Sequence, residues 1–161
     1  MPNLPVYIRM PTENETPYLE NRSGAEAVIS AVMDAQDDGW MQLHGFVVLP
    51  EGLEMVATPI KQGPAGLVAH LQSQTIPPLL ILLPGAGIIW ERRFWHIPLS
   101  SQRALDARLA ILLLAPVAAG LADMAASYPY SSANPRYTAM VAPFTGFSRI
   151  TSEAAKITAD S

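Results

Sequence analysis

The sequence predicts an α+β domain, a ferredoxin-like split β-α-β sandwich with an antiparallel sheet and an extra C-terminal helix. The order of elements is the first observation behind this prediction: strand, helix, strand, strand, helix, strand, helix. The second is size, because 161 residues, of which 50% are hydrophobic, suffice for one domain with a substantial core.

The first half of the chain contains a strand, a helix and a hairpin. Leu4–Met10 is a short apolar run that we expect to form the first strand. Helical spacing of apolar residues follows, and Ser23 with Glu26 three positions on predicts a capping box. Gly39 ends this helix. Two strand-like runs across residues 40–59, separated by a Pro-Glu-Gly turn, then predict a hairpin.

The segment after the hairpin is apolar and interrupted by prolines. Gly66–Gln74 reads as a short helix that the tandem Pro77 and Pro78 should end. Residues 79–89 fit either a strand or a packed loop. Because Leu79–Ile89 is so apolar, it must be buried in the core or cover the same surface of a second copy, which would give a homodimer.

The last part of the domain contains an edge strand and the clearest helix. Arg93–Leu99 is strand-like and carries a proline, which favours a sheet edge. Ser100–Leu114 has an apolar helical face, begins at one of its two serines, and should close at Pro116. We expect one domain over residues 1–137 and a partly ordered C-terminal extension over residues 138–161.

Composition narrows the function classes. The formal charge is −4 and cysteine is absent, which argues against tight non-specific DNA binding and excludes thiol chemistry and disulfides. No signal-like N-terminus is visible, and the apolar runs Ile76–Trp90 and Leu109–Ala122 are shorter than the roughly 18 residues needed to span a bilayer. We therefore expect a cytoplasmic protein with no membrane partner.

Three stretches in order resemble REP-associated, HUH-type single-tyrosine transposases, over about residues 4–137. The most specific is Trp90–Ser132, and Leu43–Pro50 (LHGFVVLP) and the N-terminal strand and helix come before it. The matching positions of the specific block are Trp90, Arg92, Arg93, Phe94, Trp95, Pro116, Val117, Ala119, Gly120, Leu121, Tyr128, Pro129, Tyr130, Ser131 and Ser132. The resemblance implies a transposase insertion-sequence-like fold that cuts and rejoins single-stranded DNA.

The resemblance also shows what this chain lacks. The family holds a divalent metal with a His-x-His pair on one strand and attacks DNA with a tyrosine on the next helix. The two histidine positions are Gly52 and Glu54 here, and the tyrosine position falls at or near Pro78. Glu54 alone is a weak metal ligand. The resemblance therefore implies a degenerate member with no catalytic residues and no metal cofactor.

The basic and aromatic residues near position 92 have two interpretations. The side chains of Arg92 and Arg93 could bind a phosphate, and the rings of Trp90 and Trp95 could stack on a base. Alternatively, the aromatic rings are core and the arginines pair with Glu91 or another acid.

The three histidines give little indication of a functional site. A structural role is favoured for His44, and a surface position for His70. A chance metal site could form from His44, Glu54 and His96, although no spacing matches a known zinc pattern.

Three functions remain open. The first is a catalytically inactive, transposase-like protein that retains weak binding of single-stranded or hairpin DNA. The second is a protein-interaction or dimerisation scaffold with no nucleic-acid role. The third, least favoured, is an active transposase that uses Glu54 and a different nucleophile.

Overall fold

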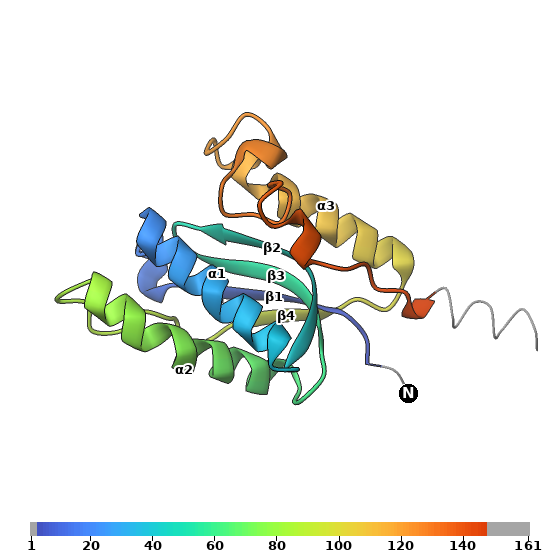
Figure 1. Cartoon of the computed structure of the whole chain (residues 1–161), viewed down its shortest axis with the longest axis horizontal. Coiled ribbons are helices and arrows are strands. Elements are labelled where there is room, and N and C mark those ends of the chain that lie inside the picture. The colour runs from blue at the N-terminus through green and yellow to red at the C-terminus, as the bar shows by residue number, and fades with distance from the viewer. Residues whose placement is uncertain (1–2, 148–161) are drawn as a thin grey trace, which may run out of the picture.

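The computed structural model describes residues 3–147 and contains a four-stranded antiparallel sheet (Figure 1). Its strands are β1 (Val6–Pro11), β2 (Met41–Leu49), β3 (Gly52–Pro59) and β4 (Trp95–Pro98), in the order β2-β3-β1-β4. This order confirms the predicted split β-α-β sandwich, with the first strand at the centre and the last at an edge.

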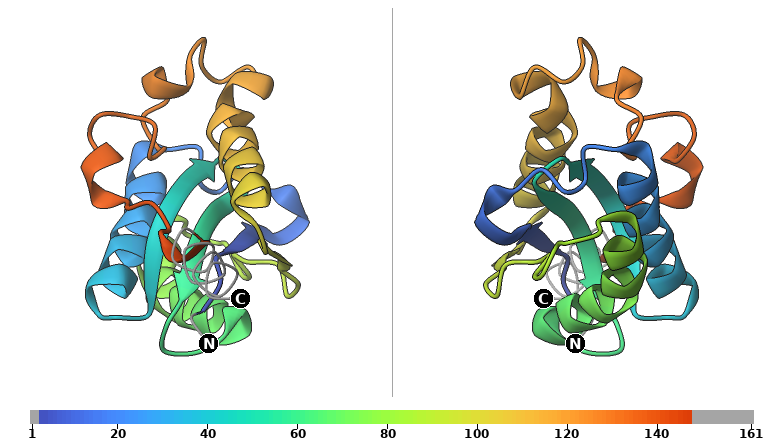
Figure 2. Two further views of the ribbon diagram at one scale, coloured as in Figure 1. Left: turned by 90° about the vertical axis from the view of Figure 1, so that its right-hand side faces the viewer. Right: turned by 90° about the vertical axis from the view of Figure 1, so that its left-hand side faces the viewer.

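Helices cover both faces of the sheet. Helices α1 (Arg22–Asp37) and α2 (Pro64–Leu82) lie on one face, and α3 (Gln102–Ala118) lies on the other (Figure 2). Short 3₁₀ turns occupy Glu13–Glu15, Ala125–Ser127 and Thr138–Met140. Because both faces are covered, β2 and β3 are buried along nearly their whole length instead of alternating between core and solvent.

The sheet separates two hydrophobic cores. The larger core lies between the sheet and helices α1 and α2, and includes Ile8, Phe46 and Met55. The smaller core lies between the sheet and α3, and includes Val56, Leu105 and Leu112. Helix α3 approaches β2 closely at Gly45, where an added Cβ would lie 2.7 Å from Leu109 Cδ2.

The start of α1 differs from the predicted capping box. Asn21, not Ser23, is the N-cap, and its side-chain oxygen accepts a hydrogen bond from the Gly24 N–H at 2.7 Å. Glu26 instead pairs with Arg22 at 3.0 Å and with Arg136 at 3.2 Å. Asparagine is as good an N-cap as serine, so the sequence offers two starts, and the structure uses the earlier one.

Helix α2 does not end before Pro77 and Pro78; the helix continues to Leu82, so that prediction is wrong. Each proline removes one N–H, but the residues four positions earlier, Ser73 and Gln74, are exposed, so water can bind their carbonyls. Buried Thr75 and Leu79 hold the helix on both sides of the prolines. Residues 79–89 are accordingly the end of a helix followed by a loop.

Helix α3 begins as predicted and ends later than predicted. The Ser101 hydroxyl accepts a hydrogen bond from the Ala104 N–H at 3.1 Å. Pro116 does not close the helix but is buried within its last turn, and the helix ends at Ala118. The edge strand β4 has the predicted position, because it pairs only with β1.

The segment after α3 runs back along the edge of β2. Val48 N–H donates to the Tyr130 carbonyl at 2.8 Å, and Ser132 N–H donates to the Phe46 carbonyl at 3.0 Å. The Tyr128 hydroxyl donates to the Val48 carbonyl at 2.6 Å. This segment therefore covers the β2 edge of the sheet.

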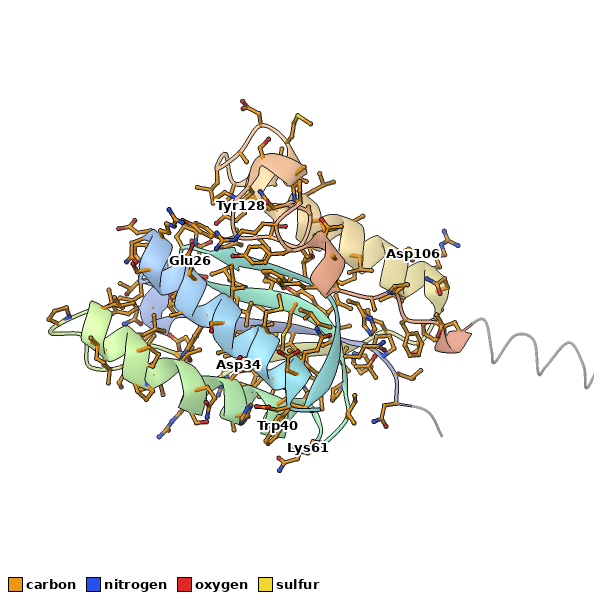
Figure 3. All side chains as sticks on the ribbon, in the orientation of Figure 1. Glu26, Asp34, Trp40, Lys61, Asp106 and Tyr128 are labelled. Carbon is orange, nitrogen blue, oxygen red and sulfur yellow. The ribbon has the colours of Figure 1, made fainter. Side chains whose placement is uncertain are left out.

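Residues 138–147 also pack on β2, where Ala142 N–H donates to the Leu43 carbonyl at 3.1 Å. The rest of the expected extension, residues 148–161, lies outside the described residues. Next to the start of β2, the Lys61 ammonium lies 4.9 Å from the Trp40 ring centroid (Figure 3). Among residues 3–147, no helix is long and apolar enough to span a membrane.

We predict that Thr75→Val destabilises the fold by about 1–3 kcal/mol, because the buried Trp90 N–H would lose its acceptor. Trp90 Nε1 donates to Thr75 Oγ1 at 2.9 Å, and Thr75 is 1% exposed. Urea denaturation measures the change in unfolding free energy. Thr75→Ser keeps the hydroxyl and should cost less; equal losses for the two variants would contradict the prediction.

Candidate nucleic-acid interface

Three strands bring Glu54, Arg9 and Trp95 into one row across the sheet. Arg9 pairs with Glu54 in the β1–β3 register and with Trp95 in the β1–β4 register. Residues directly opposite in a sheet present their side chains to the same face, here the face that α3 covers in part. Arg9 thus links two predicted site residues, although nothing in the sequence distinguishes it from an ordinary strand residue.

The Glu54 carboxylate is engaged by a tyrosine on the neighbouring strand. The Tyr7 hydroxyl donates a hydrogen bond to Glu54 Oε1 at 2.5 Å, and Tyr7 is 6% exposed. Burial and the adjacent carboxylate raise the pKa of Tyr7 above its usual value. The Arg108 guanidinium from α3 lies 4.5 Å from the Tyr7 ring centroid. A phenol held protonated in this way is a poor nucleophile at neutral pH.

The backbone fills the position of the first metal ligand. Gly52 pairs with Pro11, and a Cβ at Gly52 would lie 2.7 Å from the Met10 carbonyl oxygen and 3.0 Å from Pro11 Cα. No side chain fits there without moving β1. The second position, Glu54, already accepts a hydrogen bond. The residues present therefore do not fit the divalent metal that the fold family uses.

The position of the family's tyrosine lies in the other layer. Pro78 is half-buried on α2, and Thr75 and Leu79 beside it pack into the core between α2 and the sheet. Glu54 lies on the opposite face, because it alternates with Leu53 and Met55, which belong to that core. The helix carries no hydroxyl or imidazole at this position that could replace the nucleophile.

The aromatic residues of the predicted basic cluster divide between core and surface. Trp90 is 5% exposed, so its ring is part of the core. Trp95 is 53% exposed, and the Arg9 guanidinium lies 5.7 Å from a Trp95 ring centroid. Only Trp95 of the two tryptophans presents a face on which a base could stack.

Arg92 and Arg93 are exposed, and neither forms an ion pair within residues 3–147. Glu91 is not their partner, because its carboxylate accepts a hydrogen bond from the Asn14 N–H at 2.7 Å. Arg9 lies at 3.1 Å from Glu15. We call Arg9, Arg92, Arg93 and Trp95 the basic–aromatic strip.

Arg9 and Trp95 of the strip lie where the sheet is least covered. Helix α3 packs on β2 and β3, and all four residues of β4 are exposed. A small hollow lined by Arg9, Leu49, Glu51, Gly52 and Glu54 borders the strip. The Arg9 guanidinium and the Trp95 indole thus lie beside a hollow that Glu51 and Glu54 make acidic, and Arg92 and Arg93 precede Trp95 in the chain.

The three residues of the chance metal site are far apart in the fold. His44 is on β2 and His96 is on β4, which form opposite edges of the sheet. The His44 ring contacts the Ala142 carbonyl at 2.6 Å and the Thr58 hydroxyl at 2.7 Å, and burial lowers the pKa of His44. This site is not formed, and no other group of three metal-binding side chains occurs in the part of the chain that the structure describes.

The apolar stretch Leu79–Ile89 is only partly buried. Leu79 and Ile89 belong to the core, whereas Ile81 is 80% exposed and Ile88 is 62% exposed. A hollow lined by Ile76, Ile88 and Arg92, among others, lies between α2 and the following loop. His70 is half-buried and stacks on Trp40, with ring centroids 4.0 Å apart.

Two solved structures share this fold. A REP-associated tyrosine transposase bound to a REP hairpin superposes with a TM-score of 0.70 and 16% identity, covering 89% of this chain and 84% of that chain. A candidate transposase from Deinococcus radiodurans R1 has a TM-score of 0.53 and 14% identity, covering 69% of this chain and 90% of that one. No family model and no curated protein matches the sequence. The resemblance seen in the sequence is thereby confirmed at the level of the fold.

We predict that Gly52→Ala destabilises the protein by about 1–3 kcal/mol, as overpacking of a filled site does. Gly45→Ala is the matched control, since its Cβ would meet the tip of the flexible Leu109 side chain instead of backbone. Thermal and urea unfolding measure both. A Gly52→Ala variant as stable as the parent would show that this position has room for a side chain.

Proposed function

We propose that this chain is a transposase-like protein that has lost strand cleavage and joining and binds single-stranded or hairpin DNA through the basic–aromatic strip. The shared fold supports the transposase-like character. The observation that carries the loss of catalysis is the 2.7 Å approach of the Met10 carbonyl to the Cβ position of Gly52. We set this binding in the cytoplasm, the compartment expected from the sequence.

Strand cleavage by this fold needs a metal to polarise the phosphate and a phenol to attack it. Here the ligand positions are a glycine packed against backbone and a glutamate bonded to Tyr7. In the absence of a cation, the Glu54 carboxylate would repel a phosphate at that point. The surface around Glu54 therefore opposes the approach of a phosphodiester.

Binding is supported by the neighbouring groups. Arg92 and Arg93 carry positive charges that no acidic side chain within residues 3–147 neutralises. Trp95, two residues after Arg93 in the chain, offers an exposed ring, and base–aromatic stacking is worth about 1–3 kcal/mol per base. The net charge of −4 limits long-range attraction, so we expect weak binding that salt reduces further. The transposase that shares the fold is itself bound to a hairpin.

A second candidate function is a protein-interaction scaffold, in which the Leu79–Ile89 region covers the same region of a second copy. The high exposure of Ile81 and Ile88 favours this candidate, because monomeric proteins rarely leave neighbouring large apolar side chains in water. No charged residue occurs between Lys61 and Glu91, so nothing on this stretch opposes burial by its own charge.

We predict that the protein neither nicks hairpin DNA nor forms a covalent adduct with it in the presence of Mn²⁺ or Mg²⁺. The measurement is denaturing electrophoresis of labelled DNA with and without a 5′ single-stranded extension. A covalent band that Tyr7→Phe removes would support the third hypothesis, an active transposase that uses Glu54, with Tyr7 as the nucleophile. A band that this substitution leaves unchanged would place the nucleophile elsewhere, and either band would refute inactivity.

We predict that Arg92→Ala/Arg93→Ala weakens hairpin DNA binding and lowers the slope of log Kd against log salt by about 2, since two phosphate contacts are lost. Trp95→Ala should cost about 1–3 kcal/mol of binding. Fluorescence anisotropy at two salt concentrations measures both. Arg22→Ala/Arg136→Ala removes the same charge at the Glu26 ion pairs and should change little. Equal loss in both double variants, or no binding by the parent at low salt, would contradict the proposal.

A further inference from the structure

We propose that the outer face of α3 is a self-association surface on which α3 of a second copy packs antiparallel. This inference is independent of DNA binding and uses neither the basic–aromatic strip nor the Leu79–Ile89 region. It starts from an apolar face of a helix that residues 3–147 of one copy leave exposed.

The sheet uses one side of α3, and an apolar stripe remains on the other. Leu105, Leu112 and Pro116 are buried against the sheet, whereas Ile111 is 59% exposed and Leu114 is 54% exposed. Ala107, Ile111, Leu114 and Ala118 recur at intervals of four, three and four residues, the spacing of a helix–helix seam. No charged residue occurs between Arg108 and Asp123.

Along the stripe the side chains follow in the order small, large, large, small, and this order is the same from either end of the helix. A two-fold axis between residues 112 and 113 would place Ile111 against Leu114 of the second copy, and Ala107 against its Ala118. The large side chains then meet at the centre, and the alanines let the helix ends approach closely. A surface that complements itself under a two-fold rotation is what a closed dimer requires.

The charges at the two ends of α3 fit the same arrangement. Arg103 lies in the first turn, where the helix dipole disfavours its charge, and Asp123 follows the last helical residue, Ala118, by five positions. Neither side chain forms an ion pair among the described residues. In an antiparallel pair, Arg103 of each copy would approach Asp123 and the helix C-terminus of the other. The arrangement thus pairs both charges and compensates both dipoles.

The molecule that packs on this face of α3 is therefore a second copy of the chain. A different protein would not explain the symmetry of the stripe and of the charges at its ends. A single helix pair is smaller than the standard interface of about 1,200–2,000 Å². We expect a dimer in the micromolar range at low salt, which forms and dissociates rapidly.

Sedimentation velocity over a range of protein concentrations tests the surface. The full chain should shift from monomer to dimer as concentration rises. Ile111→Gln/Leu114→Gln, which keeps helix propensity, should abolish the shift, and Ile81→Gln/Leu82→Gln on α2 should not. If only the α2 variant abolishes association, the Leu79–Ile89 region is the interface and this proposal fails. A chain that stays monomeric at all concentrations overturns both. Circular dichroism confirms that each variant is folded.

A charge exchange tests the antiparallel arrangement. Arg103→Glu and Asp123→Arg each place like charges together at both ends of a homodimer, and should weaken self-association several-fold at low salt. Mixing the two variants restores opposite charges at both ends, so a heterodimer of parental affinity should form. No recovery on mixing would refute the antiparallel geometry. In a parallel pair, Arg103 already faces Arg103 and Asp123 faces Asp123, so neither variant alone would weaken self-association; single variants that associate as well as the parent would also refute the antiparallel geometry.

Discussion

The close pairing of β1 with β3 determines both the fold and the state of the candidate site. Their register runs without interruption from Val6 opposite Ala57 to Pro11 opposite Gly52, through the centre of the sheet. At the Gly52 end, the backbones approach so closely that only hydrogen fits in place of a side chain. The same backbone contact thus joins the two central strands and leaves no room for a side chain at position 52.

Around this contact the polar side chains engage one another. The Glu54 carboxylate accepts a hydrogen bond from the Tyr7 hydroxyl of the neighbouring strand. Arg108 covers the Tyr7 ring from α3. A cation bound at Glu54 would compete with the Tyr7 hydroxyl, which would then lose its hydrogen-bond acceptor. The basic–aromatic strip beside it has kept exposed charge and an exposed indole.

Sequence reasoning found the order of the elements and missed features that depend on tertiary contacts. The strand–helix–strand–strand–helix–strand order and the edge position of β4 follow from local patterns of apolar residues and prolines. The continuation of α2 through Pro77 and Pro78 does not, because it requires buried Thr75 and Leu79 on both sides. Arg9 could not be identified either, since only the register of two strand pairs places it between Glu54 and Trp95.

The segment Tyr128–Ser132 has a consequence for how the sheet meets other molecules. By bonding to Phe46 and Val48, it occupies the outer edge of β2. The remaining edge is β4, which is four residues long and ends in Pro98, a residue with no N–H to offer an added strand. A strand of another molecule therefore cannot pair with the covered β2 edge. At the β4 edge it could pair over only a few residues.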